Sequence, residues 1–171
     1  FLFNSKYKSK LSLVEKKMNT ILCDDSWMGH CAKYQLHSGG KRFRALLALI
    51  AADIFKINYE SAIYAAICCE FIHNASLIHD DLQDRDLLRR GLPTIWNRFG
   101  DHTAINLGDY FIAGSFEALS KIKGNPENKC KAIEHLSYTI QQTVKGQSLE
   151  ILERSNLNLR MEEYESTAKA K

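Results

Sequence analysis

A long apolar segment that ends in three carboxylates constrains this sequence more than any other feature. It begins after Asn58, runs through Phe71, and reaches Asp80, Asp81 and Asp84. The polar residues around Asn58 are typical of a helix start, and the apolar residues that follow recur with helical spacing. We therefore predict one helix from Asn58 to the aspartates, with the acidic residues at its carboxyl end.

Further helices are predicted on both sides of this segment. Apolar residues indicate helices over residues 46–55, 104–120 and 128–154. Residues 86–100 contain two glycines and a proline, so we expect a loop with a short helical piece there. Only two prolines occur in the 171 residues, and no alternating strand pattern is visible. The predicted fold class is all-α, as a single domain over residues 1–171.

Composition excludes several classes of partner. The net charge of +3 is too small to indicate a nucleic-acid partner or a polybasic membrane patch. The longest apolar run, residues 45–52, is far too short for a membrane span. Five cysteines without C-x-x-C spacing, and no visible secretion signal, favour a cytoplasmic location.

The aspartates at the end of the long segment have the spacing of a metal site. Asp80 and Asp84 are four residues apart, so a helix places both carboxylates on one face, one turn apart. Two like charges this close repel, and a fold tolerates them mainly when a cation lies between them. Carboxylate oxygens suit Mg²⁺, which usually shares its coordination shell with substrate phosphates. Arg89 and Arg90 follow and are able to bind the same phosphates, so the pattern predicts a Mg²⁺–diphosphate site.

A second phosphate-binding pattern precedes the long helix. Gly39 and Gly40 allow a close approach of the backbone, and Lys41, Arg42 and Arg44 follow them. We expect these basic residues to open the next helix, whose amino terminus favours anions. Basic residues at this end oppose the helix dipole, so phosphate binding explains them better than helix stability does.

The order and spacing of these elements resemble the trans-isoprenyl (polyprenyl) diphosphate synthases. Residues 80–84 match the D-D-x-x-D motif of that family, residues 89–91 its R-R-G, and residues 39–44 its G-G-K-R-x-R element. Two further matches, to the F-G and G-D signatures, are Phe99-Gly100 and residues 106–109, and residues 146–150 resemble the G-Q-x-x-D element. The resemblance implies a helical bundle of the isoprenoid-synthase type.

The resemblance also implies roles for individual residues. Asp80 and Asp84 would coordinate Mg²⁺, with Asp81 as a supporting residue, and Arg89 would bind the allylic diphosphate. Asp80, Asp84 and Arg89 are thus the residues predicted to carry catalysis. The contacts implied for isopentenyl diphosphate come from Lys41, Arg44, His73 and Arg90.

Three positions near the carboxyl end of the sequence complete the implied site. Gln147 and Lys171 would contact the allylic diphosphate, and Glu150 would support them where the family usually has Asp. The resemblance gives Arg42 no definite role. His79 and Asp109 are interpreted as structural.

The implied reaction is Mg²⁺-dependent, head-to-tail prenyl transfer that condenses isopentenyl diphosphate with an allylic diphosphate to make an all-trans polyprenyl diphosphate. The product would grow along the long helix, past Ala75 and Ser76, which lie five and four residues before Asp80. An aromatic residue there would stop the growth early. These two small residues therefore favour a product of C20 or longer.

The family carries a second aspartate-rich helix in its carboxy-terminal half, and that half has no counterpart here. We therefore expect this chain to be the amino-terminal part of a longer synthase, and a homodimer, because the family commonly dimerises. Two alternatives stay open. One is a non-catalytic subunit or fragment of a heteromeric synthase. The other is a terpene cyclase or head-to-head condensing enzyme on the same fold, against which residues 39–44 argue, since such enzymes need no site for isopentenyl diphosphate.

Overall fold

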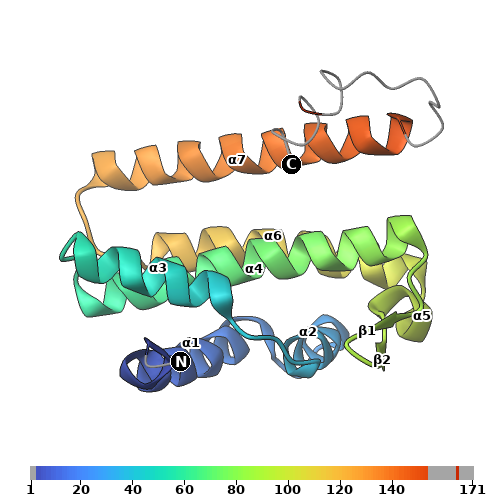
Figure 1. Cartoon of the computed structure of the whole chain (residues 1–171), viewed down its shortest axis with the longest axis horizontal. Helices are drawn as coiled ribbons and strands as arrows, with labels where there is room; N and C mark the ends of the chain where they lie inside the picture. The colour runs from blue at the N-terminus through green and yellow to red at the C-terminus, as the bar shows by residue number, and fades with distance from the viewer. Residues whose placement is uncertain (1–2, 154–164, 166–171) are drawn as a thin grey trace. The chain divides into compact units, whose positions relative to one another are not determined.

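A computed structural model describes residues 3–153 and residue 165. The chain forms two compact units, residues 1–124 and residues 125–171. The described part of the first unit contains α1 (Phe3–Leu22), α2 (Trp27–His37), α3 (Phe43–Ile54), α4 (Tyr59–Asp84), β1 (Leu88–Arg89), β2 (Leu92–Pro93), α5 (Ile95–Phe99) and α6 (Asp101–Ser120). In the second unit, α7 spans Pro126–Glu153 (Figure 1).

The all-α class is confirmed, and the four predicted helices form as α3, α4, α6 and α7 with bounds shifted by a few residues. The loop predicted over residues 86–100 contains the short helix α5, as expected, and also the antiparallel hairpin β1–β2. Strands of two residues are too short to show an alternating pattern, so periodicity could not reveal them. The prediction of a single domain stays a prediction.

Helix α4 is the central element of the first unit. It contacts α1, α3, α5 and α6, and Figure 1 shows α6 running beside it. The Asn58 side chain caps the helix by accepting a hydrogen bond from the backbone N–H of Ser61 at 2.9 Å. Arg85 adopts a left-handed conformation with φ 57° and ends the helix directly after Asp84. The acidic motif therefore occupies the last turn of the central helix.

Apolar side chains of α4 and its neighbours form the core. Phe71 of α4 and Phe111 of α6 are fully buried and meet edge to face, with ring centroids 5.6 Å apart. Among the described residues, α4 is the one helix that is long and apolar enough to cross a membrane. However, 61% of its most apolar window is buried inside the protein, which is the pattern of a core helix.

Gly108 permits the close packing of α6 against α4. A Cβ atom at this position would collide with Nε2 of His79 on α4. The same imidazole nitrogen lies 3.3 Å from the carbonyl oxygen of Ile105 on α6. His79 therefore fills the space that the glycine leaves, in agreement with its interpretation as a structural residue.

We expect Gly108→Ala to lower the free energy of unfolding by about 1–3 kcal/mol, because the imidazole or the helix must shift. Urea unfolding followed by circular dichroism measures the change. In a His79→Ala background the same substitution should be nearly neutral, since the obstacle is gone and alanine is the better helix former. An equal loss in both backgrounds would contradict this account of the contact.

Candidate functional site

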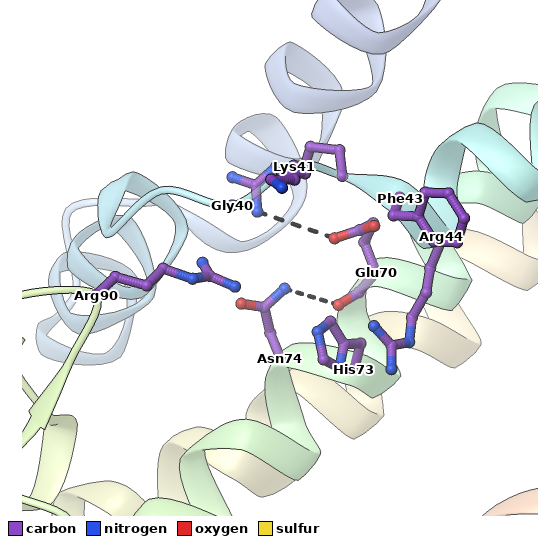
Figure 2. A pocket seen from close by; sticks show the side chains of 9 residues that line it. Gly40, Lys41, Phe43, Arg44, Glu70, His73, Asn74 and Arg90 are labelled. Carbon is purple, nitrogen blue, oxygen red and sulfur yellow. Dashed lines mark hydrogen bonds and ion pairs between the residues drawn. The ribbon is translucent and has the colours of Figure 1, made fainter. Parts of the chain in front are cut away.

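A pocket of about 630 Å³ lies in the first unit, between the segment that leads into α3, the middle of α4 and the hairpin turn. Its lining consists of Gly40, Lys41, Arg42, Phe43, Arg44, Glu70, His73, Asn74 and Arg90. Figure 2 shows the basic side chains approaching from both sides of α4. Four cationic groups around one cavity favour a polyanionic ligand with phosphate groups.

Helix α3 begins later than the prediction that Lys41, Arg42 and Arg44 open it. The helix begins at Phe43, so Lys41 and Arg42 precede it, and only Arg44 lies in its first turn. The side chains of Lys41 and Arg44 line the pocket and are exposed. Among the described residues, no hydrogen bond or ion pair involves either side chain. Both are therefore available to an anion in the pocket.

A buried carboxylate supports the start of α3. Glu70 of α4 is 2% exposed, and its Oε1 accepts a hydrogen bond from the backbone N–H of Ala45 at 3.0 Å. The first backbone N–H groups of a helix have no partner within the helix, and Glu70 satisfies one of them. The side chain of Arg42, at the N-cap position, makes no such capping hydrogen bond. The sequence analysis missed Glu70, although a lone acid within an apolar helical segment is itself a signal of a specific partner.

The hairpin turn reaches across to the two glycines. Arg90 donates a hydrogen bond from Nη1 to the carbonyl oxygen of Gly39. A Cβ atom on Gly40 would lie 2.7 Å from that nitrogen, and Gly40 also has φ 135°, which L side chains rarely adopt. Burial, and after it the nearby Arg42 and Arg89, lower the pKa of Arg90. Because Gly40 has no Cβ atom, the Arg90 guanidinium fits beside it, although Arg42 and Arg89 already concentrate positive charge there.

His73 lines the same pocket as a neutral group. Its pKa is lowered from 6.5 to about 4, first by burial and then by Arg44, Arg90 and the other arginines nearby. The imidazole is therefore uncharged at neutral pH and is able to donate one hydrogen bond without adding repulsion to the cationic wall.

The lowered pKa of His73 predicts a loss of stability in acid. The unfolded chain binds a proton near pH 6.5 and the folded chain only near pH 4, so this contribution is complete above pH 6.5 and is lost as the pH falls toward 4. Between pH 7 and pH 5, the protein should lose about 1–2 kcal/mol more unfolding free energy than a His73→Gln variant. Urea titrations at the two pH values measure the difference, and parallel losses would contradict the prediction.

The three carboxylates at the end of α4 have different surroundings. Asp81 is 2% exposed, and Nε of Arg89 donates to its two oxygens at 2.7 and 2.9 Å. Asp84 is exposed and Asp80 is partly buried. No group of three or more His, Cys, Asp or Glu side chains with metal-binding geometry occurs in the part of the chain that the structure describes. Asp80 and Asp84, one turn apart, are thus a pair of hard oxygen donors and not a complete ligand set.

Arg89 and Arg90 are adjacent in the sequence but reach opposite parts of the site. Arg90 and Gly91 form a two-residue turn with φ 55° and 80°, and Arg89 pairs with Leu92 across the hairpin. Arg89 binds Asp81 at the acidic end of α4, and its pKa is raised chiefly by that hydrogen bond. Of the two arginines, only Arg90 lines the pocket.

The structure brings together four of the predicted site residues in one pocket: Lys41, Arg44, His73 and Arg90. Along α4, Ala75 is 2% exposed, and the Ser76 hydroxyl donates to the carbonyl oxygen of His73 at 2.9 Å. Gln147 and Glu150 lie on α7 in the second unit. Lys171 lies outside the described residues. The substrate-binding, metal-binding and chain-length roles of all these residues, and of Asp80, Asp84 and Arg89, stay predictions.

The described residues define a protein of the all-α class with one short hairpin, a basic pocket and an acidic motif on one central helix. The family model for polyprenyl synthetase matches residues 25–171. The chain belongs to the polyprenyl synthetase family, which confirms the resemblance stated above.

Individual relatives agree with this assignment. A geranylgeranyl pyrophosphate synthase of Geoglobus acetivorans is 36% identical over 84% of this chain and 46% of its own length. A short chain isoprenyl diphosphate synthase of Methanocaldococcus jannaschii is 35% identical over 92% of this chain and 47% of its own. The crystal structure of a geranylgeranyl pyrophosphate synthetase from Pyrococcus horikoshii superposes with a TM-score of 0.88 at 28% identity, over 99% of this chain and 52% of that one. The expected helical bundle is confirmed, and the chain spans about half the length of these relatives.

Proposed function

We propose that the whole protein catalyses head-to-tail prenyl transfer from an allylic diphosphate to isopentenyl diphosphate, forming an all-trans polyprenyl diphosphate of C20 or longer. The observation that carries this proposal is the convergence of Lys41, Arg44, Arg90 and neutral His73 on one pocket. The helix that forms its floor ends in the predicted metal-binding aspartates. Relatives that are named geranylgeranyl diphosphate synthases support the C20 product.

The donor atoms at the end of α4 fit Mg²⁺. Asp80 and Asp84 present hard oxygen ligands one helical turn apart, and the neighbouring Asp81 is already bound by Arg89. Two protein carboxylates leave coordination positions for substrate phosphates, which is how Mg²⁺ usually binds in phosphate-transfer sites. When bound there, Mg²⁺ would neutralise charge on the allylic diphosphate.

The residues of the pocket hold isopentenyl diphosphate and leave the chemistry to the substrates. Lys41, Arg44 and Arg90 neutralise its diphosphate, and His73 donates a hydrogen bond. As the allylic C–O bond breaks, its electron pair leaves with the diphosphate, and Arg89 stabilises that charge. The double bond of isopentenyl diphosphate then forms the new C–C bond, and the proton lost from it goes to the departing diphosphate. In this proposal the product grows along α4 past the small residues Ala75 and Ser76.

We further propose that the protein is a cytoplasmic homodimer. The absence of a strong basic or acidic bias and the cysteine pattern favour this location, and family membership favours the dimer. Sedimentation equilibrium of the whole protein tests the dimer.

The test of the proposed function is an assay of the whole protein with labelled isopentenyl diphosphate and allylic primers of C5, C10 and C15. We expect incorporation of label into products of C20 or longer, and its loss when EDTA removes Mg²⁺. Label that stays in isopentenyl diphosphate while the allylic substrate alone is consumed would identify a cyclase. No consumption of either substrate would favour a non-catalytic subunit.

A further inference from the structure

Arg42 is held by the protein itself, unlike the two basic residues beside it. Its side chain is 10% exposed. Nε donates to Oε1 of Glu15 on α1 at 3.0 Å, and Nη2 donates to the carbonyl oxygen of Leu36 on α2 at 2.6 Å. Nη1 lies 3.9 Å from Oε2 of Glu70 on α4. Each of the three guanidinium nitrogens therefore faces an acceptor from a different helix, which leaves little capacity for a ligand.

Glu70 joins this arrangement to the start of α3. One carboxylate oxygen accepts from the backbone N–H of Ala45, and the other faces Arg42. Asn74, one turn further along α4, donates to the carbonyl oxygen of Glu70 at 2.8 Å and accepts from Gln35 of α2 at 3.2 Å. Figure 2 shows Glu70 between the segment that leads into α3 and the floor of the pocket. A single buried carboxylate thus contacts the residue that follows Lys41 and the residue that follows Arg44.

The backbone at this turn requires such support. Arg42 has φ 48° and ψ 38°, a left-handed conformation that is unfavourable for a residue with a Cβ atom. Strained conformations of this kind persist when the surrounding contacts determine them, and they are common beside ligand sites. Here the contacts come from Leu36, which is nearby in the sequence, and from Glu15 and Glu70, which are far from Arg42.

We propose that Arg42 and Glu70 are positioning residues, which fix the turn so that Lys41 and Arg44 face isopentenyl diphosphate, and that neither touches the substrate. The proposal rests on the proposed function for the identity of the ligand. It gives Arg42, to which the resemblance assigns no definite role, a contact with the protein, whereas Lys41 and Arg44 bind the diphosphate.

The direction in which Glu70→Gln changes the affinity for isopentenyl diphosphate distinguishes a positioning role from a direct electrostatic effect. Glu70→Gln removes a negative charge from the wall of an anion pocket, so charge alone predicts tighter binding of isopentenyl diphosphate. Positioning predicts weaker binding, because the amide no longer attracts the Arg42 guanidinium. The substitution preserves side-chain size and an acceptor for Ala45, which favours a folded variant.

We expect Glu70→Gln and Arg42→Gln each to raise KM for isopentenyl diphosphate about tenfold, with KM for the allylic substrate and kcat within about twofold of the unmodified protein. The double variant should be no worse than either single one, since both break the same coupling. Glu60→Gln is the matched control, because Glu60 is a half-exposed acid at the other end of α4 that pairs with Lys123. It should leave both KM values unchanged.

Titration calorimetry with inorganic diphosphate in EDTA tests the same point without turnover. We expect Glu70→Gln to weaken binding about tenfold, as it raises KM. Binding that is unchanged or tighter, or additive effects in the double variant, would overturn the proposal. Should the unmodified protein bind diphosphate in a Glu70-dependent manner yet transfer no prenyl group, the proposed function fails and the positioning role stands. Should it bind no diphosphate, the positioning role fails.

Discussion

The Asp84→Asn variant of the whole protein is expected to lose prenyl transfer by roughly 10²–10³-fold in kcat at saturating substrate. The carboxylate is one of two hard oxygen donors on the last turn of α4, and the amide that replaces it carries no charge for Mg²⁺. Product formation from labelled isopentenyl diphosphate measures the loss. A shift of the Mg²⁺ concentration for half-maximal rate to higher values should accompany it.

Asp86→Asn is the matched control for this substitution. Asp86 is an exposed aspartate two residues beyond the motif, and the same chemical change there should leave the rate within about twofold. Equal losses in the two variants would point to a diffuse effect of negative charge. An unchanged rate in Asp84→Asn would remove Asp84 from the proposed metal site.

Arg89→Met is expected to lower the free energy of unfolding by about 3 kcal/mol. Asp81 is buried, with its side chain 3% exposed, and Arg89 donates to both of its oxygens. Methionine keeps the length of the side chain but leaves a carboxylate inside the protein without its partner. Urea unfolding at neutral pH measures the change.

Arg85→Met supplies the comparison for the buried pair. Arg85 pairs with Asp101 at 2.8 Å, but 58% and 46% of the two side chains are exposed. Such a surface pair contributes at most about 1 kcal/mol. A loss in Arg89→Met as small as that in Arg85→Met would show that solvent screens the Arg89–Asp81 pair despite its burial.

Helices α3, α4, α6 and α7 were predicted because their signals are local, whereas α1 and α2 were not predicted. Asn58 caps α4 from within its own first turn, and the apolar spacing of α4 extends without interruption to the aspartates. The hairpin escaped prediction because each strand has two residues, and its turn uses Arg90, which has no special preference for a left-handed backbone.

The residues of the candidate site could be predicted from the sequence, but the contacts that each of them makes could not. A pattern of glycines and basic residues indicates phosphate binding, and the resemblance assigns Lys41 and Arg44 to isopentenyl diphosphate, but neither gives Arg42 a definite role. The partners of Arg42 are Glu15, Leu36 and Glu70, and only the fold brings them together. Likewise, the spacing and the resemblance set Asp81 apart as a supporting residue, but only the fold shows that it is buried and bound by Arg89.

The two-residue turn of the hairpin has a consequence for constructing hybrids with other members of the family. Its length sets the register that sends Arg89 toward Asp81 and Arg90 toward Gly39. One inserted residue would shift the pairing by one position and direct a side chain to the opposite face. The segment from Arg85 to Thr94 must therefore be exchanged as one block, together with the glycine at position 40 that receives Arg90. A crossover point between Arg89 and Leu92 would separate two residues that pair across the hairpin.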